Sequence, residues 1–179
     1  MKRTALFLTV LCASPALAQA PNDPPPNAAV SAAGAAWKSV SAYLQAAAEQ
    51  VPEADYSYRP TPEVRSFGEL IGHVAGSQQM FCAAAMGEQP PEEDAVEKSA
   101  KTKAELVEAL EKSSEYCARA YAQTDAQVVG SVKMFGQEMP KLNVLVMNAT
   151  HDNEHYGNVV TYLRMNGIVP PSSRPRGGN

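Results

Sequence analysis

The stretch that decides the fold is SFGELIGHVAGSQQMFCAAAMG, residues 66–87. Ser66 followed three residues later by Glu69 matches a capping box, in which each side chain bonds the backbone N–H of the other residue at the start of a helix. Gly87 is typical of the residue that follows a helix. Apolar residues recur between these signals at helical spacing, at Phe67, Leu70, Ile71, Val74 and Phe81. The stretch therefore predicts one helix with a broad apolar face.

Prolines divide the rest of the chain. They cluster at 52–62, at 90–91 and at 140, and they leave four long windows without proline. Because proline ends helices, the windows predict four helices, at about 30–50, 66–87, 102–121 and 140–166. Thr102 and Glu105 repeat the capping box at the start of the third. Residues 128–139 alternate weakly in polarity and contain two glycines, which predicts an irregular or hairpin-like connection.

Four such helices predict an all-α fold, a four-helix bundle in one domain, which suits 179 residues of which 45% are hydrophobic. The link between the second and third helices holds about fifteen residues and could reach about 50 Å when extended. The second helix is only about 30 Å long. An up-down-down-up order is therefore as feasible as the simple up-down order.

The first residues predict a targeting segment. Lys2 and Arg3 precede an apolar run, and Ala16-Leu17-Ala18 supplies small residues for cleavage, so we expect a signal peptide at 1–18. The expected mature chain is a Pro-rich spacer at 19–29, the bundle at 30–171 and a disordered tail at 172–179. We expect an exported protein, periplasmic or secreted, without a stable membrane span.

The net charge and the number of cysteines limit which partners and which cellular compartment are expected. Lys and Arg number 15 against 19 Asp and Glu, a net charge of −4, and no basic run could follow a phosphate backbone, so no nucleic acid partner is expected. Two cysteines remain after cleavage, Cys82 and Cys117. They would pair in an oxidising compartment or stay separate buried thiols, and the sequence leaves both open.

The three histidines, His73, His151 and His155, all fall inside predicted helices. His151 and His155 are four residues apart, so one turn stacks them on the same face at a spacing used by helical metal sites. His73 lies on an apolar line of the second helix and would complete a set of three. Histidines that merely fill the core are the competing interpretation.

Three neutral imidazoles would leave a position open on a divalent ion, which is a catalytic pattern rather than a closed structural one. Zinc is the default ion, and nickel, iron or copper would accept the same set. Glu154 is a weak candidate base about 60° from His151 on the helix, and Asp152 is more consistent with a supporting or surface group. Ordinary solvated acids on the exposed face of the helix are the competing interpretation for both.

Four motifs together resemble one family: YSYRP at 56–60, VRSFGELIGHV at 64–74, HDNEHYG at 151–157 and YLRMNGIVPP at 162–171. They resemble the DinB-like (damage-inducible, YfiT-like) metalloenzymes over about residues 30–171. The resemblance implies an up-down-down-up bundle, often a homodimer, with a divalent metal on His73, His151 and His155.

The resemblance also implies a metal-dependent hydrolase or transferase acting on a small molecule. Some relatives are transferases and isomerases that use low-molecular-weight thiols in a reducing cytoplasm, and the export signal here argues against a thiol cosubstrate. The alternative is a non-catalytic protein that binds a metal or a small molecule.

Overall fold

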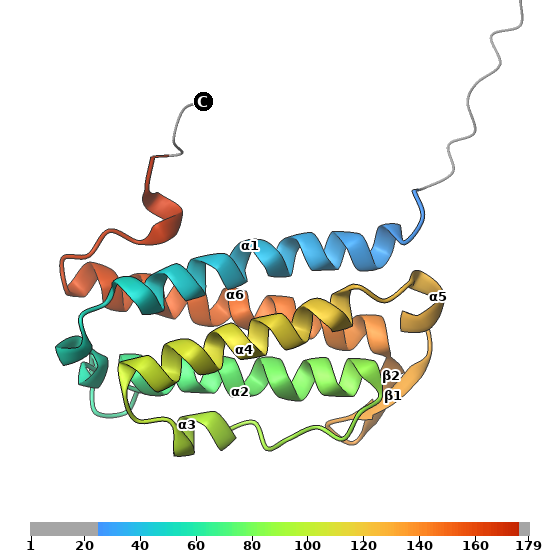
Figure 1. Ribbon diagram of the computed structural model, residues 1–179, viewed down its shortest axis with the longest axis horizontal. Helices are drawn as coiled ribbons and strands as arrows, with labels where there is room; N and C mark the ends of the chain where they lie inside the picture. The colour runs from blue at the N-terminus through green and yellow to red at the C-terminus, as the bar shows by residue number, and fades with distance from the viewer. Residues whose placement is uncertain (1–24, 176–179) are drawn as a thin grey trace, which may run out of the picture.

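Four long helices lie side by side in the computed structural model, which describes residues 25–175 (Figure 1). The expected signal peptide and most of the spacer fall outside these residues. The long helices are α1 (Ala28–Gln50), α2 (Phe67–Met86), α4 (Lys103–Tyr121) and α6 (Lys141–Met165). Each overlaps one of the four predicted helices, and α1 begins two residues earlier than expected.

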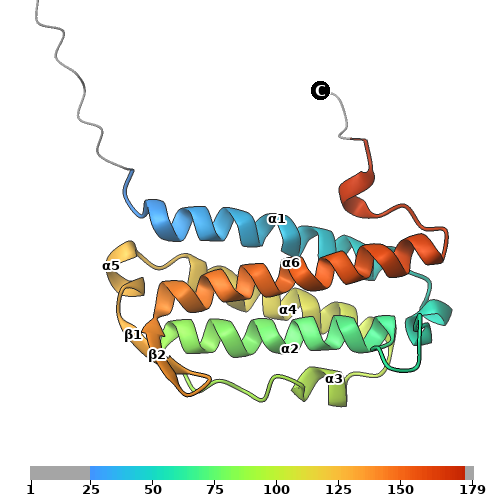
Figure 2. The ribbon, with the colours of Figure 1, turned by 180° about the vertical axis from the view of Figure 1, so that it is seen from behind.

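The order of the helices is up-down-down-up. In Figure 1, α1 and α6 run in one direction, and α2 and α4 run in the other. The connection between α2 and α4 returns along the outside of α2 and carries the short helix α3 (Ala95–Ser99) (Figures 1 and 2). The all-α four-helix bundle is confirmed, and the long connection is what allows two consecutive long helices to run parallel.

Short elements close the ends of the bundle. A 3₁₀ turn, η1 (Glu53–Ser57), follows α1, and α5 (Asp125–Val128) follows α4. The strands β1 (Ser131–Met134) and β2 (Gln137–Pro140) form an antiparallel hairpin, with Phe135 and Gly136 at positive φ in its turn. The connection before α6 is thus a hairpin, because two residues at positive φ suit a two-residue turn.

The helix ends agree with the sequence signals. Ser66 and Glu69 form a complete capping box at α2, and Thr102 and Glu105 form one at α4. Gly87 ends α2 at φ 80°, in the left-handed region that favours glycine. The start of α1 is instead capped from far away, since the Asp125 carboxylate accepts hydrogen bonds from two of its backbone N–H groups.

The core surrounds α2, most of whose side chains are buried. Cys82 on α2 and Cys117 on α4 are both fully buried and form a disulfide, with a Cα–Cα distance of 5.3 Å. The sequence left open whether these cysteines are paired or free thiols, and in the structure they are paired. Within residues 25–175, no helix is both long and apolar enough to span a membrane.

The chain beyond α6 is more ordered than expected. Pro171–Ser173 form a 3₁₀ turn, η2, which crosses the expected boundary between the bundle at 30–171 and the tail at 172–179. The hydroxyl of Tyr156 donates to Ser172 Oγ at 2.9 Å and accepts from the Ser172 backbone N–H at 3.0 Å. The buried Tyr156 thereby holds residues that composition alone marks as tail. Residues 176–179 lie outside the described part.

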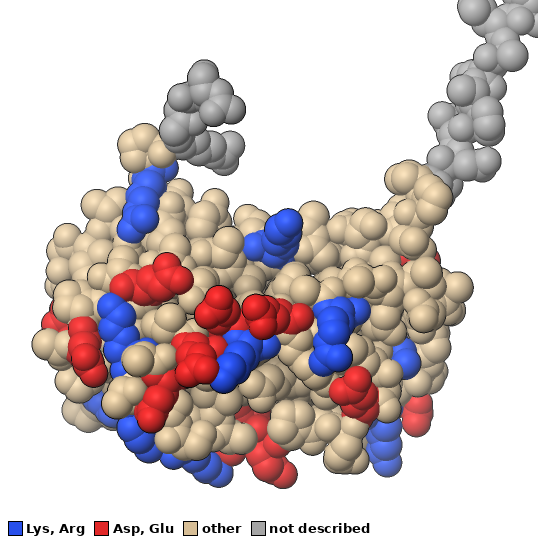
Figure 3. All heavy atoms as spheres, viewed as in Figure 1, with Lys and Arg blue, Asp and Glu red and all other residues tan. Residues whose placement is uncertain are grey.

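Charged side chains of both signs are intermingled on the face of the molecule seen in Figure 3. Among the described residues, two exposed ion pairs join side chains four residues apart, Asp94 with Lys98 and Glu108 with Lys112. Exposed pairs of this kind contribute little to stability. The ordered polar contacts that bear on function lie instead where α2, α6 and the α3 connection meet.

Candidate metal centre

Three histidine rings from two helices meet inside the bundle. His73 lies on α2, and His151 and His155 lie one turn apart on α6. The Nε2 atom of His155 is 3.1 Å from Nε2 of His73 and 3.0 Å from Nε2 of His151. Their ligand atoms all lie within 4.8 Å of one another. The structure therefore brings together the three histidines that the sequence singles out.

The donor set fits a divalent metal ion. A tetrahedral ion bonded to imidazoles at about 2.0–2.1 Å would separate their nitrogens by about 3.3 Å, close to the two separations measured from His155. Each Nε2 carries either one proton or one lone pair, so His155 cannot make a proper hydrogen bond in both of its contacts. An ion that accepts all three lone pairs would remove this conflict.

Burial lowers the pKa of all three histidines. For His155, burial and then the neighbouring His151 lower the pKa to about 4. Burial is also the first cause for the other two, followed by Arg65 for His73 and by His73 for His151. The neutral ring is the form that binds metals, so the lone pairs are available at neutral pH.

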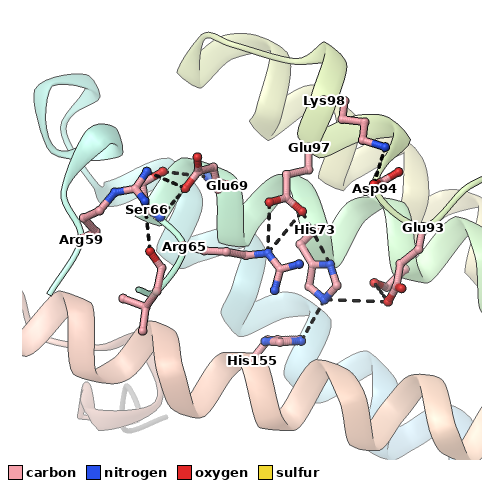
Figure 4. A network of polar contacts seen from close by, with 12 residues as sticks. Arg59, Arg65, Ser66, Glu69, His73, Glu93, Asp94, Glu97, Lys98 and His155 are labelled. Atoms are coloured by element: carbon pink, nitrogen blue, oxygen red, sulfur yellow. Dashed lines mark hydrogen bonds and ion pairs between the residues drawn. The ribbon is translucent and has the colours of Figure 1, made fainter. Parts of the chain in front are cut away.

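A carboxylate from the connection between α2 and α4 lies beside the three histidine rings. Glu93 lies in the connection before α3, and its Oε1 is 3.9 Å from Nε2 of His73 (Figure 4). The same oxygen is 3.9 Å from Nε2 of His151. Ser77 on α2 donates a 3.1 Å hydrogen bond to that oxygen. The Glu93 side chain is 40% exposed, so solvent reaches this edge of the site. Sequence reasoning missed Glu93, because it lies in a link with several acids and no helical pattern.

Two glycines of α2 allow this connection to come so close. A Cβ at Gly76 would lie 2.0 Å from the backbone oxygen of Glu93, and one at Gly72 would lie 2.9 Å from the Cα of Glu97. The glycines stand one turn apart and so leave a smooth strip along α2. The absence of side chains at Gly72 and Gly76 therefore determines how closely Glu93 and Glu97 approach His73.

Replacing Gly76 with alanine should displace Glu93 without altering any side chain of the site. The new Cβ would overlap a backbone group, and overpacking of this kind costs about 1–3 kcal/mol. Urea unfolding of Gly76→Ala beside Gly157→Ala would measure the cost, since a Cβ at Gly157 on α6 meets nothing within 4 Å. Two variants of equal stability would show that the close approach is not needed.

Glu97 lies near the other nitrogen of His73, a buried atom that has no hydrogen-bond partner among the described residues. Its Oε2 is 3.8 Å from Nδ1 of His73, and both of its carboxylate oxygens accept hydrogen bonds from Nε of Arg65 at 3.1 and 3.2 Å (Figure 4). A carboxylate beside the outer nitrogen of a metal-binding histidine commonly fixes the orientation of the ring. The α3 connection thus places one carboxylate near each nitrogen of His73, beyond hydrogen-bond distance.

Comparison with known protein families matches residues 36–159 to the DinB superfamily. This match covers more than half of the chain and includes all three histidines. The chain belongs to the DinB superfamily. The family resemblance seen in the four sequence motifs is therefore confirmed, whereas a comparison with curated proteins finds no match.

Solved structures with the DinB fold are similar over most of the chain. A DinB-like protein of Bacillus cereus is 16% identical with a TM-score of 0.68, over 79% of this chain and 95% of its own. YfiT of Bacillus subtilis, a probable metal-dependent hydrolase with an unusual four-helix bundle topology, is 15% identical with a TM-score of 0.61, over 78% and 88%. The mycothiol-dependent maleylpyruvate isomerase is 19% identical with a TM-score of 0.59, over 73% and 59%.

Asp152 and Glu154, the two acids between His151 and His155 in the sequence, are not part of the group of converging ligand atoms in this DinB-superfamily chain. Glu154, the predicted candidate base, is exposed on α6. Its negative charge partly offsets the lowering of the pKa of His151 and His155 by burial. Asp152 is fully buried and accepts a 2.8 Å hydrogen bond from Gln78. Burial raises the pKa of Asp152 to about 8. Asp152 is therefore neither solvated nor at the metal centre, but part of the buried packing between α6 and α2.

Proposed function

We propose that this DinB-superfamily protein is a metal-dependent hydrolase or transferase of a small molecule, with its divalent ion held by His73, His151 and His155. The observation that carries the proposal is the convergence of three Nε2 atoms beside a partly exposed carboxylate. A closed structural site would need no such exposed edge. Among proteins of similar structure, a probable metal-dependent hydrolase and an isomerase support an enzyme.

Zinc is the ion that three imidazoles bind by default, and nickel, iron and copper suit the same donors. An ion held there would act as a Lewis acid on water or on a substrate oxygen. Glu93 stands where it would accept a proton from a water or a substrate hydroxyl that enters beside His73 and His151. Glu97 would keep the His73 ring turned toward the ion.

Two glutamates provide a matched test of this assignment. Glu93→Gln should keep the metal, because the three histidines are intact, and should lower turnover of the metal-loaded protein by about a hundredfold, the usual contribution of a general base. Glu154→Gln carries the same change on exposed α6 and should keep both metal and turnover. Metal content and hydrolysis of ester, amide and phosphoester substrates would be measured on protein without an affinity tag.

The result also separates catalysis from binding. Loss of turnover in Glu154→Gln alone would identify Glu154, the weak candidate of the sequence analysis, as the base. Metal-loaded protein that turns over no substrate class would support the alternative of a non-catalytic metal-binding or small-molecule-binding protein.

We also propose that the protein is exported. The predicted signal peptide at 1–18 supports this, and so does the buried Cys82–Cys117 disulfide, because disulfides persist mainly outside the reducing cytoplasm. Export in turn argues against a cytoplasmic thiol as cosubstrate. The homodimer implied by the family resemblance stays a prediction.

A further inference from the structure

Arg65 is fixed at both ends beside the metal centre. It precedes the capping residue of α2, and its backbone carbonyl accepts a 2.6 Å hydrogen bond from the hydroxyl of Tyr162 on α6. At the other end, its Nε donates to both oxygens of Glu97. Anchoring of this kind removes much of the freedom that an arginine side chain would otherwise lose on binding a ligand.

The anchored guanidinium turns its binding face toward the histidines. Glu97 contacts Arg65 and His73 with the same carboxylate, and Figure 4 shows the terminal nitrogens of Arg65 on the side of His73 and His155. Among residues 25–175, neither terminal nitrogen of Arg65 donates a hydrogen bond to a protein group. The side chain is 42% exposed, so a dissolved molecule can reach it.

Arg59 provides the contrast. It is nearly as exposed, at 41%, and also pairs with a glutamate, but both of its terminal nitrogens are engaged. One donates to the backbone oxygen of Val64 at 3.2 Å, and the other donates to Glu69 at 2.9 Å. Of these two arginines, only Arg65 keeps two parallel N–H donors for a ligand.

Two parallel donors of a guanidinium match the two oxygens of a carboxylate. The surrounding charge favours a single negative charge, because Glu93 and Glu97 stand on either side of His73 and would repel a dianion such as phosphate more strongly. Glu93 and Arg65 also flank His73 from opposite sides in Figure 4. A molecule bound between them would have its anionic end at Arg65 and its reacting end near Glu93.

We propose that Arg65 is the recognition residue for a carboxylate of the substrate, held beside the three histidines. This inference rests on the proposed function, since it places the substrate next to the bound ion. It narrows the substrate class to small monocarboxylates whose reacting group lies close to the carboxylate.

Binding to the cobalt-loaded protein tests the inference without any need for turnover. Acetate and its neutral isostere acetamide would be titrated while the visible absorption of the bound cobalt is followed. Arg65→Gln should weaken acetate binding about tenfold or more, as expected for loss of charged hydrogen bonds, and should leave acetamide binding unchanged. Arg65→Lys should fall between wild type and Arg65→Gln, because it keeps the charge and loses the paired donors.

Two controls separate direct contact from other effects. Arg59→Gln removes the same charge and should leave acetate binding unchanged. Arg65→Gln combined with Glu97→Gln should remain weak, and recovery of acetate binding in this double variant would show that an unpaired Glu97 caused the loss, which would overturn the inference.

The two proposals fail in different ways. Wild-type protein that binds no cobalt would overturn the proposed function and this inference with it. Cobalt-loaded Arg65→Gln that binds acetate as wild type does would overturn the inference alone.

Discussion

Replacing His151 with alanine should abolish metal retention and any activity that depends on the metal. The variant keeps only two of the three converging nitrogens, those of His73 and His155. Loss of a supporting group outside the ligand set already costs about 10–100-fold in metal affinity, and loss of a ligand should exceed that. Elemental analysis of protein purified without a metal-affinity tag would measure the stoichiometry, with about one ion per chain expected for the wild type.

Thr150→Ala is the matched control for this prediction. Thr150 precedes His151 on α6, is exposed, and bonds only backbone oxygens of its own helix. It should keep full occupancy and normal unfolding. Full occupancy in His151→Ala would remove the metal site, and a wild-type melting temperature unaffected by chelation would identify the histidines as core residues. A bound ion at a hundred times its dissociation constant should stabilise the fold by about 2.7 kcal/mol.

Among the substitutions considered for their effect on folding, removing the disulfide should cause the largest decrease in the free energy of unfolding. Cys82 and Cys117 are 35 residues apart and link α2 to α4, so the bond restricts a sizeable loop of the unfolded chain. The double variant Cys82→Ala/Cys117→Ala should lose about 2–4 kcal/mol in urea unfolding. It should still bind metal, because Cys82 lies nine residues after His73 and so faces the opposite side of α2.

Reduction distinguishes the covalent link from the packing of the two side chains. A thiol reductant added during unfolding should lower the stability of the wild type and leave the double variant unchanged. Equal urea midpoints for oxidised wild type and the double variant would mean that the bond contributes nothing to the fold.

The sequence by itself determined the helices and the identity of the three histidines. Capping boxes at Ser66 and Thr102 and the breaks at proline act within a few residues, so they can be read without knowing the fold. The stacking of His151 and His155 follows from the pitch of one helix in the same way. The position of His73 on the second helix made it the candidate third ligand, the family motifs supported the same set, and the structure brings all three together.

Only the tertiary structure decided which groups surround the histidines. Glu93 reaches them because Gly76 lets a backbone 17 residues further along the chain pack against α2, and no local pattern encodes that approach. The same holds for Arg65, which Glu97 and Tyr162 orient from α3 and α6. The disulfide likewise depends on contact between distant segments, since the sequence left open whether Cys82 and Cys117 pair. Such contacts form only when the helices pack together, so the periodic pattern of one helix does not predict them.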